Sequence, residues 1–176
     1  MDIKTASSEE LLERRTAIAG EIDAPEADLY ALEAIRLLYK YLPVAVKDGK
    51  NLKARAKVAW ASTLAGMVEA TSSCTSEHSI EHALSAYYPN LQHGAGLIAI
   101  SEAYYETFKN DCMKRYMKMA EAMLERKSNR PSDFIDALII MQKECGVSFC
   151  ILESYKVVNT PLLSQCSSYF CKLFRS

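Results

Sequence analysis

Apolar residues recur at helical spacing along most of this chain, and that periodicity limits the fold more than any other feature. Ala31, Ile35, Leu38 and Leu42 lie three or four residues apart, which places their side chains on one face of an α-helix. No segment shows the sustained two-residue alternation, bounded by hairpin turns, that is typical of strands. The sequence therefore predicts an all-α fold with almost no sheet.

Capping residues and breaks divide the chain into segments. We expect helices that begin at Pro25, Asn51, Gly94, Cys112 and Pro131. The first should end before Asp48-Gly49, and the others near Ala70, Phe108, Leu124 and Glu144. Ser76 is a candidate cap for the histidine helix, which ends before the break at Pro89-Asn90. Residues 1–23 form an N-terminal segment in which Ser7-Ser8 and the acids that follow open a helix. Residues 24–147 form the helical domain. Residues 148–176 form a divergent tail, because helical periodicity is lost after Tyr155.

Composition indicates one folded domain in a reducing compartment. Hydrophobic residues make up 49% of the chain. Its 21 basic and 22 acidic residues nearly balance, and no segment combines basic and aromatic residues as a nucleic-acid surface would, so we expect no nucleic-acid partner.

The apolar stretches are too short to cross a bilayer, and no hydrophobic signal core opens the chain. We therefore expect no membrane partner and a cytoplasmic location. The six cysteines include no CxxC pair, which favours free thiols; Cys166 and Cys171 give only a weak signal for a metal site.

All three histidines of the chain lie between His78 and His93. His78 and His82 are four residues apart, so a helix places them on one face, and His93 follows a break at Pro89-Asn90. Neutral imidazole is the commonest ligand of transition metals in proteins and also moves protons near neutral pH. Single histidines often cap helices or form hydrogen bonds in the core, but this clustering favours a functional site.

Two chemistries fit this histidine window. In the first, His78-Ser79-Ile80-Glu81-His82 matches the HxxEH pattern of inverted zinc peptidases, in which two histidines hold zinc and the glutamate activates water. That zinc hydrolase would need a third ligand on a later helix, for which only Glu102 and Glu106 stand out. In the second, His78 and His93 hold a metal ion and His82 relays a proton beside the substrate.

A family resemblance favours the second chemistry. The segments that carry it are Asp28–Leu38, Tyr41–Gly49, Ala61–Met67, the window Glu77–Gly94 and Gly94–Ile98. Between about residues 24 and 147 the chain resembles the helical C-terminal domain of iron-containing (group III) alcohol dehydrogenases. The resemblance implies a helical bundle that carries one divalent metal, Fe²⁺ or alternatively Zn²⁺, beside an N-terminal domain that binds NAD(P).

Matched to the family motif, His78 is the first histidine ligand and His93 the second. His82 is the histidine near the nicotinamide and the substrate, and the resemblance implies that it is the catalytic proton relay. The implied activity is the NAD(P)-linked interconversion of a small alcohol and its aldehyde or ketone.

The chain also departs from the family pattern. It has no DxxxH pair to complete the ligand set; Glu9 and Glu13 stand at the corresponding distance, although a capped helix start with solvated acids explains them more simply. It has neither a GxGxxG nor a glycine-rich phosphate loop on a strand-to-helix turn. We therefore expect a truncated homologue with impaired activity on its own.

Two further expectations follow from this truncation. As the alternative to an enzyme, the chain is a non-enzymatic helical interaction module or remnant. An exposed docking face near Tyr87-Tyr88 also predicts self-association, or pairing with a complementing nucleotide-binding chain.

Overall fold

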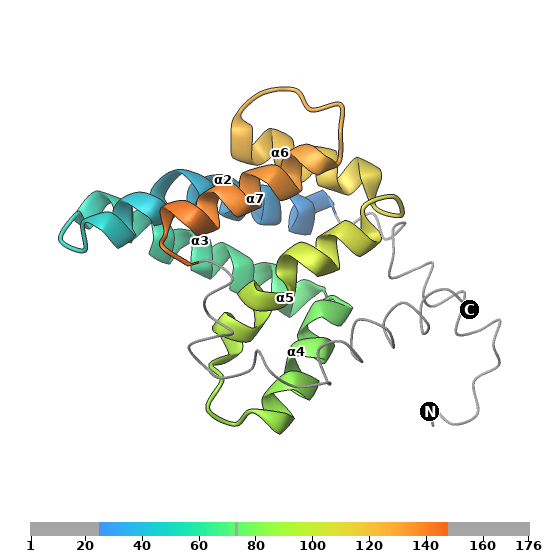
Figure 1. The fold of residues 1–176 in the computed structure, drawn as a ribbon. Helices are drawn as coiled ribbons and strands as arrows, with labels where there is room; N and C mark the ends of the chain where they lie inside the picture. Colours follow the sequence, from blue (N-terminus) through green and yellow to red (C-terminus); the bar gives the residue numbers. More distant parts are fainter. Residues whose placement is uncertain (1–24, 73, 148–176) are drawn as a thin grey trace. The chain divides into compact units, whose positions relative to one another are not determined.

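The computed structural model describes residues 25–72 and 74–147, and these form helices joined by short loops. The helices are α2 (Pro25–Lys47), α3 (Leu52–Thr71), α4 (Ser76–Tyr87), α5 (His93–Phe108), α6 (Met113–Leu124) and α7 (Ser132–Glu144) (Figure 1). No strand occurs among the described residues, so the predicted all-α class is confirmed there. The N-terminal segment with Glu9 and Glu13, the tail, and the Cys166–Cys171 pair lie outside the described residues.

Most predicted helix boundaries agree with the structure within one or two residues. Asn51 caps α3, and its side chain accepts a hydrogen bond from the backbone N–H of Ala54 at 3.0 Å. Pro43 lies inside α2, which continues to Lys47. The predicted cap of the histidine helix is wrong by one residue, because Thr75 occupies the N-cap position and Ser76 is the first helical residue.

The described residues divide into two compact units, and one of them holds the main core. This unit contains α2, α3, α6, α7 and the end of α5 from Ala103 onward. Within it, α2 lies against α3, α6 and α7 (Figure 1). Small residues let α2 and α3 approach closely: the buried cluster between them is Ala34, Leu37, Ala61 and Leu64.

A second buried cluster joins α6 and α7. Its members are Tyr116, Ala120, Met123, Phe134, Ile135 and Ala137, with Ile35 and Tyr39 of α2 packed against it. Phe134 meets Tyr105 edge to face, with ring centroids 5.0 Å apart, and lies 5.2 Å from Tyr116. Such aromatic pairs add to the stabilisation that burial alone provides.

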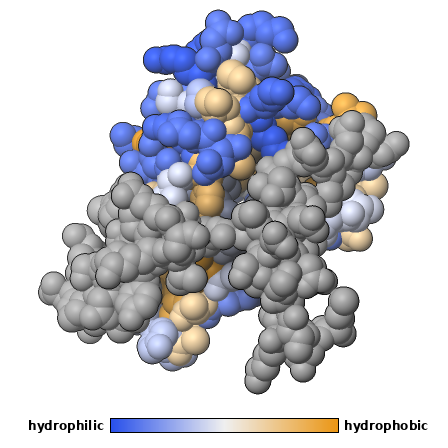
Figure 2. Space-filling model, turned by 90° about the vertical axis from the view of Figure 1, so that its right-hand side faces the viewer, coloured by the Kyte–Doolittle hydropathy of each residue, from blue (hydrophilic) through white to orange (hydrophobic). Residues whose placement is uncertain are grey.

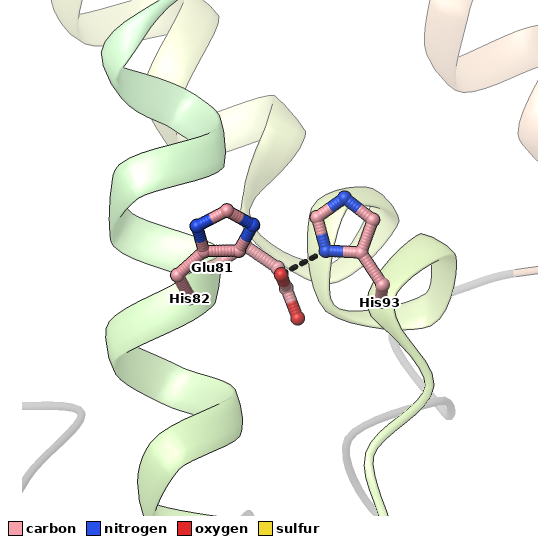
Figure 3. A group of neighbouring side chains, drawn as sticks. All are labelled: Glu81, His82 and His93. Carbon is pink, nitrogen blue, oxygen red and sulfur yellow. Dashed lines mark hydrogen bonds and ion pairs between the residues drawn. The ribbon is translucent and has the colours of Figure 1, made fainter.

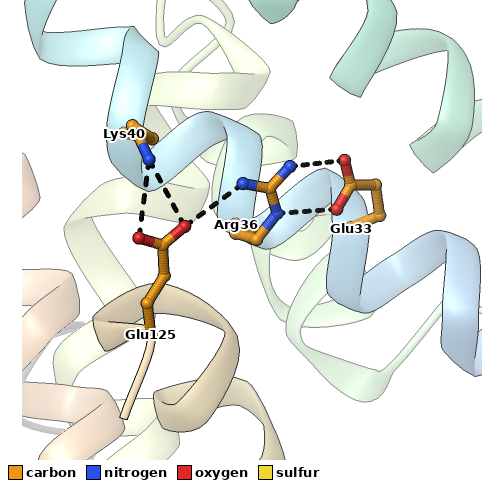
Figure 4. Close-up of polar contacts among 4 residues, drawn as sticks. All are labelled: Glu33, Arg36, Lys40 and Glu125. Carbon is orange, nitrogen blue, oxygen red and sulfur yellow. Dashed lines mark hydrogen bonds and ion pairs between the residues drawn. The ribbon is translucent and has the colours of Figure 1, made fainter.

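Ion pairs fix the C-terminal end of α6 against α2 (Figure 4). Glu125 has a left-handed backbone conformation, with φ of 52°, and accepts hydrogen bonds from Arg36 at 3.2 Å and from Lys40 at 3.4 Å. Arg36 also donates two hydrogen bonds of 2.7 Å to Glu33, one turn earlier on α2. These hydrogen bonds hold the pKa of the Glu33 and Glu125 carboxyls below their usual values.

Asp133 organises the loop between α6 and α7. Its carboxylate accepts a hydrogen bond from Ser128 Oγ at 2.9 Å and two from Arg130, at 3.1 and 2.7 Å. The hydrogen bond from Ser128, followed by those from Arg130, holds the pKa of Asp133 below its usual value.

Replacing Asp133 with asparagine should therefore lower the melting temperature in a pH-dependent way. The folded-state pKa lies below the unfolded value of about 3.9, so the carboxylate stabilises the fold above that pH and loses this effect as the pH falls toward the folded-state pKa. Asp133→Asn should melt a few degrees below the wild type at pH 7 and by a smaller margin at pH 3. Asp136→Asn, on the exposed side of the same helix, is the control and should match the wild type at both pH values.

The other compact unit contains α4 and the start of α5, up to Glu102. Polar and charged residues cover most of the coloured surface in Figure 2, with apolar residues in small groups among them. None of the helices in the described part of the chain is long and apolar enough to span a membrane. Cys74, Cys112 and Cys145 are free thiols, as predicted for them.

Candidate metal centre

The loop between α4 and α5 brings His93 to face the two histidines of α4. Tyr88 is the C-cap of α4, and the buried Leu91 follows in the loop, where its backbone N–H donates to the Tyr88 carbonyl oxygen at 2.8 Å. α5 then begins at His93 itself. The loop thus places the buried Leu91 two residues before the exposed His93, the first residue of α5.

The three imidazole rings form one cluster around His93. Its ring centroid lies 5.3 Å from that of His78 and 5.3 Å from that of His82, with interplanar angles of 44° and 37°. The four-residue spacing on α4 therefore does place both rings toward one partner, as the sequence predicts. His82 and His93 are exposed, whereas His78 is half-buried.

Glu81 is the buried member of this site. Its side chain has no solvent exposure, and its carboxylate lies between His82 and His93 (Figure 3). One oxygen, Oε1, accepts a hydrogen bond from Ser85 Oγ on the next turn, and the other, Oε2, pairs with His93 Nδ1. Both carboxylate oxygens are thus engaged by side chains of the same unit.

The electrostatics of Glu81 favour its charged form. Burial raises the pKa of the Glu81 carboxyl, but hydrogen bonds from Ser85 and His93, with the charges of His93 and His82, more than offset burial. The net result is a pKa below the ordinary value for glutamate. An ionised carboxylate can only accept hydrogen bonds, so the proton of its contact with His93 belongs to Nδ1.

Gly96 makes room for the Glu81 side chain. A Cβ atom at this position would lie 2.6 Å from Glu81 Oε1 and 2.7 Å from Glu81 Cγ. α5 thus approaches the carboxylate more closely than any residue with a side chain would allow. Gly94, two residues earlier in α5, has nothing within 4 Å of the equivalent position.

The donor atoms present suit a divalent transition metal. One ligand atom from each of Glu81, His82 and His93 can be chosen so that all three lie within 4.8 Å of one another, the scale of a single coordination sphere. Imidazole and carboxylate are donors that zinc and ferrous iron both accept. The tightest group therefore includes His82 rather than His78, while His78 adds a third imidazole beside His93.

The sequence did not reveal the role of Glu81 in holding His93. The HxxEH pattern assigns this glutamate to water activation, whereas the structure buries it and engages both of its oxygens. A signal was nevertheless present, because Ser85 follows Glu81 by four residues and Gly96 follows His93 by three. Ser85, one turn after Glu81, thus supplies a hydrogen-bond donor to the carboxylate, and Gly96, one turn after His93, leaves space for it.

Comparisons with known proteins place this geometry in a family context. Residues 21–156 match the model of the C-terminal region of the Fe-containing alcohol dehydrogenase family. The long-chain primary alcohol dehydrogenase AdhA of Thermoanaerobacter ethanolicus is 35% identical over 128 residues, which are 65% of this chain and 30% of that protein. Alcohol dehydrogenase 4 of Saccharomyces cerevisiae is 30% identical over 70% of this chain and 32% of its own length.

A solved structure supports the same grouping. The archaeal halo-thermophilic alcohol dehydrogenase ADH/D1 from a Red Sea brine pool superposes with a TM-score of 0.68 at 32% identity, covering 73% of this chain and 34% of that one. The chain therefore spans about a third of the length of each of these three relatives.

Proposed function

The chain belongs to the Fe-containing alcohol dehydrogenase family, and we propose that it is the metal-binding helical part of an NAD(P)-linked alcohol dehydrogenase. The observation that carries this proposal is the convergence of His78 and His82 on His93, in a stretch that matches the family's C-terminal region. The agreement of fold class with the helical bundle expected of that region adds to it. The substrate class is a small alcohol or its aldehyde.

We assign His78 and His93 as metal ligands and His82 as the proton relay. Bound Fe²⁺ or Zn²⁺ would polarise the oxygen of the alcohol and lower its pKa. His82 is exposed and stands one turn from His78, so its imidazole is accessible to a substrate held at the cluster and is suited to accept the hydroxyl proton. NAD(P) would be held by a complementing nucleotide-binding chain.

The zinc hydrolase alternative has less support. That mechanism needs Glu81 to hold and activate a water molecule, which requires a carboxylate oxygen open to solvent. Glu81 has no exposure, and Ser85 and His93 engage its two oxygens. The interaction-module alternative remains compatible with exposed apolar side chains such as Tyr87, which is 67% exposed.

Metal titration of the full chain tests the proposed ligands. Anaerobic calorimetric titration with Fe²⁺ and with Zn²⁺ should give one ion per chain. His78→Ala and His93→Ala should each weaken binding by more than about 100-fold, because losing a ligand costs more than the 10–100-fold typical of losing a residue that orients one. His82→Ala is the control and should bind metal as the wild type does.

Two outcomes would contradict this assignment. Weak binding that neither His78→Ala nor His93→Ala alters would mean that the histidines do not hold the ion. Binding lost in His82→Ala but kept in His78→Ala would make His82 the ligand, in keeping with the tightest donor group of the structure.

A further inference from the structure

Glu81 is a fully buried charged residue that the proposed reaction does not use. It has no solvent exposure on a helix whose other buried residue is also acidic, Glu77. Burying a carboxylate costs free energy unless hydrogen bonds satisfy it, so glutamate rarely lies inside a protein without a specific partner. The partners here are Ser85 and His93, and His93 is a proposed metal ligand.

The contact with His93 determines which of its nitrogens can bind metal. Oε2 of Glu81 pairs with Nδ1, so whenever the ring is neutral its proton lies on Nδ1 and a lone pair stays on Nε2. In metal sites the hydrogen bond made by one ring nitrogen fixes the tautomer, the orientation and the basicity of the other. The contact spans the turn between α4 and α5, so it also fixes the ring relative to His78 and His82.

The rest of the site holds the Glu81 carboxylate in one place. Ser85 donates to Oε1 and so leaves Oε2 for His93. Gly96 lies against the same side chain, since a Cβ there would come within 2.6 Å of Oε1. Three residues from two helices thus set the position of one carboxylate, which is the arrangement expected of a residue that orients a ligand.

We propose that Glu81 is a positioning residue, which holds His93 in the Nδ1–H tautomer and thereby makes Nε2 the metal-binding atom. The part about metal binding through Nε2 rests on the proposed function, because it takes His93 as a ligand. The part about the tautomer does not, since its premise is only the contact between Glu81 and His93. Glu81 in this account neither ligates the ion nor activates water.

Nitrogen-15 NMR of the histidine side chains tests the tautomer in the metal-free full chain. The wild type should show His93 as the Nδ1–H tautomer, and Glu81→Ala should turn it into a mixture of tautomers. Glu102→Ala, which removes an exposed glutamate of α5 in the same unit, is the matched control and should leave His93 unchanged. A wild-type His93 protonated on Nε2, or a Glu81→Ala spectrum identical to that of the wild type, would overturn the proposal.

Zinc affinity tests the consequence for metal binding. Glu81→Ala should bind Zn²⁺ about 10–100-fold more weakly than the wild type, the usual effect of losing a residue that orients a ligand. Should Glu81→Ala fail to fold, Glu81→Gln keeps the buried volume and an oxygen that can accept from Nδ1–H. Its affinity should fall between the wild type and His93→Ala. Affinity as low as that of His93→Ala would make Glu81 itself a ligand and overturn the positioning role.

The two measurements separate this inference from the proposed function. If the wild type binds no metal but shows the Nδ1–H tautomer, which Glu81→Ala loses, the proposed function fails and the positioning of His93 by Glu81 stands. If metal binds at the histidines with His93 unaffected by Glu81→Ala, the proposed function stands and the positioning role fails.

Discussion

Ile135→Ala is expected to lower the free energy of unfolding by about 2–5 kcal/mol, the usual cost of truncating a large aliphatic side chain in a core. Ile135 is 2% exposed and belongs to the cluster that joins α6 and α7. Truncation would leave a cavity in this cluster, because a close-packed core relaxes only partly around a lost side chain. Urea denaturation followed by circular dichroism measures the change.

Ile140→Ala provides the matched control on the same helix. Ile140 is 48% exposed, so the same chemical change removes fewer contacts and leaves no enclosed cavity. Ile140→Ala should lower the free energy of unfolding by well under half as much as Ile135→Ala does. Equal losses for the two variants would show that the buried face of α7 is assigned incorrectly.

Gly96→Ala is the second large effect that we expect, with a cost of about 1–3 kcal/mol from overpacking. The new methyl group would stand 2.6 Å from Oε1 and 2.7 Å from Cγ of Glu81, so the carboxylate must move. Helix propensity alone would make alanine more stable than glycine here by up to about 1 kcal/mol. A net decrease in stability would therefore indicate the clash with Glu81. Thermal unfolding measures the stability, and the His93 tautomer reports whether the carboxylate has shifted.

Gly94→Ala separates the clash from the loss of glycine as such. Gly94 is in the same helix and has open space around its Cβ position, so the substitution should be neutral or slightly stabilising. A Gly96→Ala variant as stable as Gly94→Ala, with an unchanged His93 spectrum, would contradict the close packing of α5 on Glu81.

Local signals in the sequence were sufficient to predict the helices. Asn51 before an apolar-periodic segment, and Pro131 before Ser132-Asp133, predicted where α3 and α7 begin within one residue, because capping depends on neighbouring residues alone. Thr75 rather than Ser76 occupies the N-cap position of α4, with an extended backbone and no capping hydrogen bond from its side chain, so the presence of a hydroxyl residue did not identify the N-cap.

The site was predicted less completely, because its contacts join residues that lie apart in the sequence. The spacing of His78 and His82 predicted two rings on one face, and both rings do lie 5.3 Å from that of His93. The contact of Glu81 with His93 spans a twelve-residue separation across the loop between α4 and α5. Local periodicity carries no information about such a contact, and the HxxEH pattern suggested another role for Glu81.

Zinc K-edge X-ray absorption on the zinc-loaded full chain tests the central claim most directly, because it counts the imidazoles bound to the ion. The account predicts at least two imidazole ligands in the wild type and one fewer in both His78→Ala and His93→Ala, with His82→Ala unchanged. A zinc ion coordinated by oxygen or sulfur alone, or by the same number of imidazoles in all these variants, would contradict it.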